Sequence, residues 1–362
     1  MAPRTGRAHA SLRLVLAALA ALLALALGAA PVQASTATGP RVASPLPALH
    51  TVRGWVAAGL TDTMVTPDVA QQLSGNAYAW IPKSQCLTTA IDSANATPCV
   101  LGDVAAATTV VLVGDSSADQ WALDLGSLGS ADGFRLVVYV HSACPVGAVA
   151  VALYGEHPDP SCPAFRALVL ADLAAMHPRP VLVLASELRL SNYVSATGGR
   201  LSDASWSKGL TRTLDTLEGD GLGVAVLHGV PVTATDPASC IAANPAALTR
   251  CTVQRDHADP GGYDEATWAG AHAARAAVVN VSPLFCTTTA CPAVVDGDVT
   301  HSGDNHVTER YAAAVTPALA ELVGCTVAQS FAHRAGAAPV LRRLLGTTAS
   351  TRVLRACRAL AP

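Results

Sequence analysis

The stretch VLVGDSSADQW, residues 111–121, decides the fold class of this chain. It begins with an apolar run that has the length and β-branched composition of a buried strand. The apolar run ends at Gly114-Asp115-Ser116, just before a helical pattern. A buried strand that turns directly into a helix is typical of a βαβ unit in a parallel sheet. Ser116 is therefore predicted at the carboxyl end of a strand, which is where ligands bind in such sheets.

The rest of the chain repeats this alternation of short apolar runs and longer helical patterns. It predicts a doubly wound, three-layer α/β sandwich around a mainly parallel, five-stranded sheet with right-handed crossovers. The predicted strands are Thr109 to Val113, Leu136 to Val140, Val181 to Ala185, Gly223 to Leu227 and Ala277 to Val281. The predicted helices are Pro163 to Met176 and Asp264 to Ala276.

A serine at position 116 has the surroundings that a nucleophile needs. The backbone N–H groups at the start of a helix can stabilise an oxyanion, and Gly114 allows a tight turn beside the substrate. The alternative is that Ser116 only caps the helix, because serine is a favoured N-cap residue. A partner base elsewhere in the chain decides between the two roles.

The candidate base is His306, in a polar loop that follows the last predicted strand. A serine hydroxyl becomes a good nucleophile when an imidazole accepts its proton, and the imidazole needs an acceptor that sets its tautomer. Asp304, two residues before His306, is the candidate acceptor. The predicted catalytic residues are therefore Ser116, His306 and Asp304.

With these residues the chain resembles the SGNH/GDSL hydrolases, and in particular the periplasmic SGNH domain fused to type 3 membrane acyltransferases. The likeness covers roughly residues 80 to 325. It implies a flavodoxin-like fold and the transfer or removal of acyl groups on carbohydrates of the cell envelope. The matching blocks are Gly114-Asp115-Ser116, Gln120-Trp121, Ser142-Ala143-Cys144-Pro145, Phe285-Cys286 to Cys291-Pro292, and Asn305-His306-Val307-Thr308 to Tyr311-Ala312.

The chain departs from the family pattern beside both candidate catalytic residues. Ser117 replaces the histidine that usually follows the family's serine. The family's last block is Asp-x-x-His, but Gly303 stands three residues before His306, so either Asp304 takes the acid's role or a Ser-His dyad works alone. The segment Asp298 to His301 has the family spacing, but it ranks second because it lacks the Val-Thr and Tyr-Ala that follow His306.

The family's oxyanion hole combines the N–H of the serine with a glycine after the second strand and an asparagine after the third. The resemblance implies the N–H of Ser116 for the first role and Gly147, displaced along its loop, for the second. No Gly-x-Asn follows the third predicted strand. The loss of one oxyanion donor can reduce turnover by ~10² to 10³.

The first 34 residues have the pattern of a secretory signal peptide, with three arginines, the apolar run Leu14 to Leu27 and a small-x-small site at Val32-Gln33-Ala34. An uncleaved anchor is the alternative, although the run is shorter than the ~20 residues of a membrane-spanning helix. The expected organisation is a signal peptide 1–34, a linker 35–47, an N-terminal extension 48–107 packed on the core, a hydrolase-like core 108–325, and a C-terminal extension 326–362 tied by a disulfide.

Ten cysteines, all after residue 34, form an even set in a chain that is expected to be exported. Zinc binding is the competing interpretation, but the sequence contains no Cys-x-x-Cys pair. Five disulfides are therefore predicted, and closeness in sequence suggests Cys86 with Cys99, Cys144 with Cys162, Cys240 with Cys251, Cys286 with Cys291, and Cys325 with Cys357.

The predicted function is that of a secreted or extracytoplasmic serine esterase or O-acyltransferase, a monomer without a cofactor, acting on acylated carbohydrates or lipid esters at the cell-envelope surface. Removal of three arginines with the signal changes the formal net charge from −3 to −6, which argues against nucleic acid as a partner. Two alternatives remain open: a secreted lipase or phospholipase of the same superfamily, and an exported binding protein that has kept the fold and lost the chemistry.

Overall fold

The structure is a computed structural model. It describes residues 46–74, 86–88, 98–152, 161–186, 194–195, 201–232, 236–258, 263–303, 306–330 and 351–358. All of these belong to one compact unit, Ser44–Pro362. The predicted signal peptide and Asp304 lie outside the described residues.

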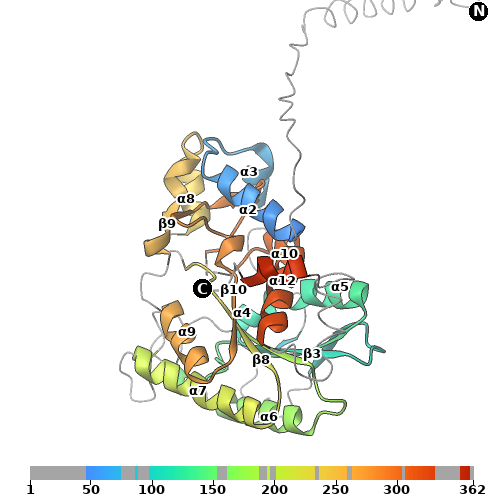
Figure 1. Ribbon diagram of the computed structural model, residues 1–362. Helices are drawn as coiled ribbons and strands as arrows, with labels where there is room; N and C mark the ends of the chain where they lie inside the picture. The colour runs from blue at the N-terminus through green and yellow to red at the C-terminus, as the bar shows by residue number, and fades with distance from the viewer. Residues whose placement is uncertain are drawn as a thin grey trace, which may run out of the picture. The chain divides into compact units, whose positions relative to one another are not determined.

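The described part of the chain forms a seven-stranded sheet in the order β1-β4-β3-β6-β8-β10, with β2 also paired to β4 (Figure 1). From β4 to β10 every pairing is parallel, in the order of a doubly wound, flavodoxin-like sheet. The strands are β1 (Leu87–Thr88), β2 (Cys99–Gly102), β3 (Thr109–Gly114), β4 (Arg135–His141), β6 (Leu182–Ser186), β8 (Val224–His228) and β10 (Ala277–Asn280).

The predicted count of five strands was too low by two. The extra strands, β1 and β2, both lie along the outer edge of β4, and β2 is antiparallel to it. They have only two and four residues, which is too short for a periodic sequence pattern to reveal. The disulfide Cys86–Cys99 joins the two segments at this edge.

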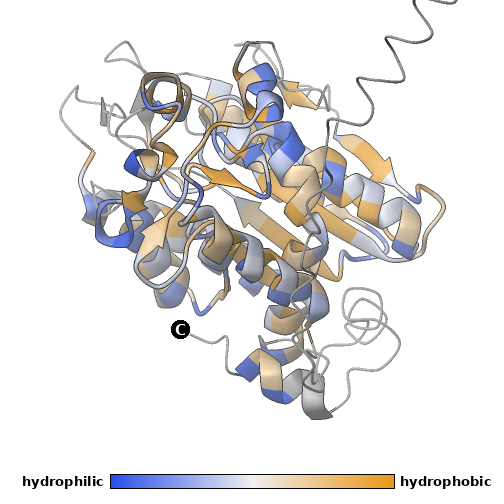
Figure 2. Cartoon of the chain, turned by 90° about the horizontal axis from the view of Figure 1, so that it is seen from above, coloured by the Kyte–Doolittle hydropathy of each residue, from blue (hydrophilic) through white to orange (hydrophobic). Residues whose placement is uncertain are grey.

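Helices cover both faces of the sheet. The side chains of β3 alternate between two cores, with Val110 and Leu112 in one and Val111 and Val113 in the other. Strands are coloured mainly hydrophobic in Figure 2, while the covering helices carry both hydrophilic and hydrophobic residues. The first core contains α5 (Ala122–Asp132) and α10 (Glu309–Ser330), and the second contains α6 (Ser161–Ala175), α7 (Asp203–Gly219) and α9 (Tyr263–Ala273).

Smaller elements surround this sandwich and include the short helix α4 that follows β3. Three two-stranded ribbons, β5-β7, β9-β11 and β12-β13, are antiparallel. The bounds are α2 (Pro47–Gly59), α3 (Pro67–Ser74), α4 (Ser116–Asp119), α8 (Pro237–Ala243), α12 (Thr351–Arg358), η1 (Leu248–Cys251), η2 (Arg255–His257), η3 (Ser282–Leu284), β5 (Val151–Ala152), β7 (Val194–Ser195), β9 (Val253–Gln254), β11 (Ala290–Cys291), β12 (Val294–Val295) and β13 (Asp298–Val299).

Helix α10 connects the ends of the described chain to the core. Glu321 in α10 accepts hydrogen bonds from the backbone N–H groups of Ala48 and Leu49, at 3.2 and 2.8 Å, and so caps the first turn of α2. Among the described residues, α10 is the one helix that is long and apolar enough to cross a membrane, but 78% of its most apolar window is buried in the protein. It is a core helix of the sandwich.

The cysteine pairing confirms the prediction from sequence closeness. All ten cysteines are paired, and no cysteine is free. Cys325 in α10 is joined to Cys357 in α12, which ties the C-terminal helix to the core. The pairs are Cys86–Cys99, Cys144–Cys162, Cys240–Cys251, Cys286–Cys291 and Cys325–Cys357.

Candidate active site

Ser116 begins α4 at the carboxyl end of β3. It is the only residue between positions 109 and 122 that is not fully buried. The helix is capped by Asp115, whose Oδ1 accepts a hydrogen bond from the N–H of Ser117 at 2.7 Å. The hydroxyl of Ser116 is therefore not the N-cap of this helix, which removes the main reason for a purely structural role.

Gly114 allows the chain to turn at this point without a clash. A Cβ atom on Gly114 would lie 1.8 Å from the carbonyl oxygen of Ser186 at the end of β6, a distance that atoms cannot reach. The Ser186 hydroxyl in turn donates to the carbonyl of Ser117 at 3.0 Å. Close contact between α4 and the end of β6 thus holds Ser116 at the edge of the sheet.

His306 is half-buried in a loop that is bound to the same helix. Val307, the next residue, donates its N–H to Oε1 of Gln120 at 2.9 Å. Gln120 is the C-cap of α4 and lies one turn after Ser116, whose carbonyl accepts the Gln120 N–H. The carbonyl of His306 also accepts from the N–H and the hydroxyl of Ser302, at 2.8 and 3.1 Å. The structure therefore brings the backbone of His306 next to the helical turn that Ser116 begins.

Asp304 lies in the undescribed gap between Gly303 and His306, so its role as the acid stays a prediction. Gly147 is buried against α7, where a Cβ atom would lie 3.0 Å from the N atom of Leu210. Close packing accounts for a glycine at that position. Its role as an oxyanion donor also stays a prediction.

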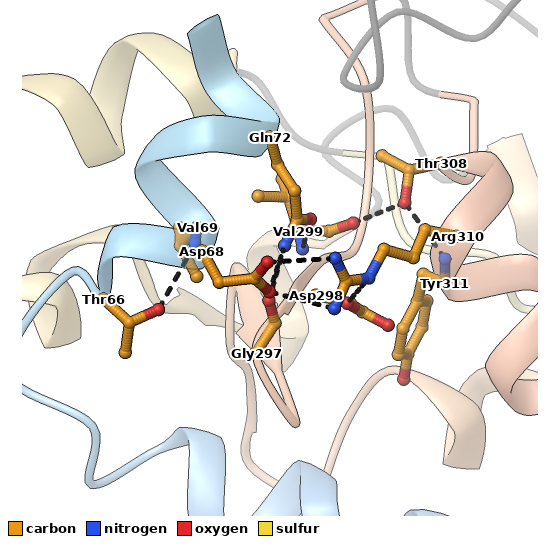
Figure 3. A network of polar contacts seen from close by, with 10 residues as sticks. All are labelled: Thr66, Asp68, Val69, Gln72, Gly297, Asp298, Val299, Thr308, Arg310 and Tyr311. Carbon is orange, nitrogen blue, oxygen red and sulfur yellow. Dashed lines mark hydrogen bonds and ion pairs between the residues drawn. The ribbon is translucent and has the colours of Figure 1, made fainter. Parts of the chain in front are cut away.

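The alternative pair, Asp298 with His301, is not joined in the structure. Oδ1 of Asp298 lies 2.5 Å from Nε of Arg310, and the same guanidinium also pairs with Asp68 (Figure 3). Burial raises the pKa of the Asp298 carboxyl and Arg310 opposes this shift. Nδ1 of His301 is bonded instead to the hydroxyl of Thr300, at 2.9 Å. Asp298 therefore does not orient His301, although the two have the family spacing.

Two features at the edge of the sheet were not predicted. Ala143, in the loop after β4, has a φ of 55°, a conformation that costs energy for a residue other than glycine. Nδ1 of His228, at the end of β8, lies 2.7 Å from Oδ1 of Asp264 at the start of α9. Alanine is not a residue that signals a left-handed turn, and the histidine pair joins positions far apart in sequence, so neither feature had a local signal.

His228 is an unsuitable base for Ser116 despite its carboxylate partner. In the sheet order, β8 is separated from β3 by β6. Strands are ~4.8 Å apart, so the ends of β3 and β8 are about 10 Å apart, beyond hydrogen-bond reach. Oδ1 of Asp264 also accepts the N–H of Gly229 at 2.9 Å, which fixes the loop after β8.

A pair of acids adds negative charge between α5 and the start of α10. Burial, and after it repulsion by Glu309, raises the pKa of Asp124 to about 6. Because this pKa lies above the ordinary value of 3.8, the protonated carboxyl favours the folded state. The resulting stability is fully present below the ordinary pKa and is lost as the pH rises through about 6.

We expect Asp124→Asn to stabilise the protein at pH 8 and to have no effect at pH 4. A pKa that is higher by about two in the folded state than in the unfolded state corresponds to ~3 kcal/mol in the free energy of unfolding. We reduce this to about 1–2 kcal/mol because the carboxyl is partly exposed. Thermal unfolding at both pH values, with Asp62→Asn as the control for an exposed aspartate, tests this. An equal gain at pH 4 and pH 8 would contradict the electrostatic explanation.

Taken together, the chain is an α/β domain with a partly exposed serine at the carboxyl edge of a parallel sheet and a histidine loop bound to the same helix. The family model described as "SGNH domain (fused to AT3 domains)" matches residues 85–321. The chain belongs to this family, as the sequence resemblance predicted. It is thus of the SGNH hydrolase/acyltransferase class.

Two solved structures are similar to this chain at low sequence identity. The periplasmic domain of the lipopolysaccharide acetyltransferase of Salmonella ser. Paratyphi A is 12% identical with a TM-score of 0.47, over 69% of this chain and 94% of that one. TesA is 20% identical with a TM-score of 0.33, over 62% of this chain and 100% of that one. A search of the curated proteins finds no match.

Proposed function

We propose that this protein is an extracytoplasmic serine esterase or O-acyltransferase that acts on acylated carbohydrates or other esters of the cell envelope. The reaction passes through an acyl group on Ser116. The single observation that carries the proposal is the binding of the His306 loop to α4, one turn from a partly exposed Ser116. Family membership supports the reaction class, and five disulfides support a compartment outside the cytoplasm.

In the first half of the reaction, Oγ of Ser116 attacks the ester carbonyl while the imidazole of His306 accepts its proton. The bond from Oγ to the carbonyl carbon forms, and the negative charge moves to the carbonyl oxygen. The N–H at the start of α4 stabilises this oxyanion. When the tetrahedral intermediate collapses, the bond to the alcohol breaks, and His306 returns the proton to the alcohol.

In the second half, water or a sugar hydroxyl attacks the acyl group on Ser116. His306 accepts the proton of the attacking group and then gives it to Oγ of Ser116, which restores the enzyme. Water gives hydrolysis and a sugar hydroxyl gives transfer. Among the described residues there is no cluster of three or more side chains that could hold a metal ion, and none of these steps needs one.

A fluorophosphonate probe tests whether Ser116 is activated, because only such a serine reacts with it. We expect one probe molecule per chain, located on Ser116 by peptide mass spectrometry. His306→Ala should slow the labelling by ~10² or more, because a general base contributes 10² to 10⁴ to such steps. An unlabelled native protein would instead favour the alternative of a binding protein that has lost its chemistry.

A further inference from the structure

One cavity in the described part of the chain is lined by neither Ser116 nor His306. It has a volume of about 320 Å³ and lies between the α8-η1-β9 segment on one side and the segment from Phe285 to His301 on the other. A six-membered sugar ring fits in a space of this size. The residues that the argument uses are Arg250, His257, Phe285, Pro292, Thr300 and His301.

The charge of the cavity favours an anionic ligand. Arg250 and His257 contribute to the lining, and both are exposed. No aspartate or glutamate lines this cavity among the described residues. The neighbouring Asp236 caps α8, where its carboxylate accepts from the N–H groups of Ala238 and Ser239 at 3.2 and 3.0 Å. The guanidinium of Arg250 can bind a carboxylate or phosphate with two parallel hydrogen bonds.

The uncharged part of the lining is mostly buried and rigid. Phe285 and Pro292 line the cavity as buried side chains, and Phe285 is only 1% exposed. Two disulfides, Cys240–Cys251 and Cys286–Cys291, hold opposite sides of the cavity. A rigid wall reduces the entropy that would be lost when a ligand binds.

His301 also lines this cavity. The hydroxyl of Thr300 donates to the carbonyl of Ala293 at 3.2 Å, so its only proton is used there. With that proton in use, Nδ1 of His301 donates to the Thr300 oxygen at 2.9 Å, and in this tautomer Nε2 carries no proton. Within the described residues this buried Nε2 has no hydrogen-bond partner, and His301 is only 2% exposed.

The cavity is connected to the candidate catalytic loop through His301. His301 and Val307 form an isolated antiparallel bridge, and Val307 follows His306 directly. We propose that the cavity binds an acidic sugar unit, bearing a carboxylate or a phosphate, of the glycan whose ester reaches Ser116. The assignment to that glycan rests on the proposed function, whereas the binding of an acidic sugar does not.

Isothermal titration of the purified protein with glucuronate, glucose 6-phosphate and glucose tests the proposal. We expect at least one acidic sugar to bind about tenfold or more tightly than glucose, and the comparison of the two separates carboxylate from phosphate. Arg250→Gln should weaken the binding of that acidic sugar about tenfold and leave the affinity for glucose unchanged. Arg53→Gln, which changes an exposed arginine on α2, is the matched control and should bind as the wild type does.

Equal affinities for glucose and both acidic sugars, no binding of any of the three, or no difference between Arg250→Gln and Arg53→Gln would each overturn the proposal. Ser116→Ala should bind all three sugars as the wild type does. Probe labelling of Ser116 without sugar binding would refute the cavity's role and leave the proposed reaction intact. Sugar binding without probe labelling of Ser116 would support the cavity's role and refute the proposed reaction.

Discussion

Ser116→Ala should abolish turnover of p-nitrophenyl acetate and leave the protein folded. Loss of a serine nucleophile can cost ~10⁶ in turnover, so we expect a loss of at least ~10³ even for a slow enzyme. Stability should hardly change, because Asp115 caps α4 and Ser116 is not part of the buried core.

The control for this experiment is Ser127→Ala, which removes an exposed serine hydroxyl from the neighbouring helix α5. It should hydrolyse the ester at the wild-type rate. Thermal unfolding of both variants shows whether either one is misfolded. Undiminished turnover in Ser116→Ala would refute the nucleophile assignment, and with it the proposed reaction.

Asp304→Asn should reduce turnover by two or more orders of magnitude if Asp304 is the acid of a triad. An orienting carboxylate holds the imidazole in the tautomer that accepts the serine proton and stabilises the imidazolium that forms. Replacing the acid by its amide in a full triad can cost ~10⁴. Steady-state kinetics at constant pH measure the effect, at ~1.4 kcal/mol per tenfold.

Asp298→Asn is the matched variant, because Asp298 is the acid that has the family spacing. Its carboxylate pairs with Arg310, so we expect a loss of stability with little change in the rate per folded molecule. A loss below about threefold in Asp304→Asn would show that His306 works without this acid, since threefold is only ~0.7 kcal/mol. A large loss in Asp298→Asn alone would assign the role of the acid to the other pair.

Local sequence patterns predicted much of the sheet. The strand expected at Leu136 to Val140 is observed as Arg135–His141, and the one at Gly223 to Leu227 as Val224–His228. Both are buried on two faces, so nearly every residue is apolar and the run stands out from its surroundings. The short edge strands β1 and β2 were missed, because their pairing with β4 depends on a distant part of the chain.

The sequence by itself determined that Ser116 follows a buried strand and begins a helix, because an apolar run followed by Gly-Asp-Ser specifies that turn locally. Closeness in sequence also suggested the disulfide pairs, whose members are between 5 and 32 residues apart, and the structure confirms them. Only the tertiary structure decided which histidine loop contacts α4 and which aspartate pairs with Arg310. Val307 lies 187 residues from Gln120, and Arg310 lies 242 residues from Asp68. Contacts over such separations depend on how the whole sheet and its helices pack, and no short pattern encodes them.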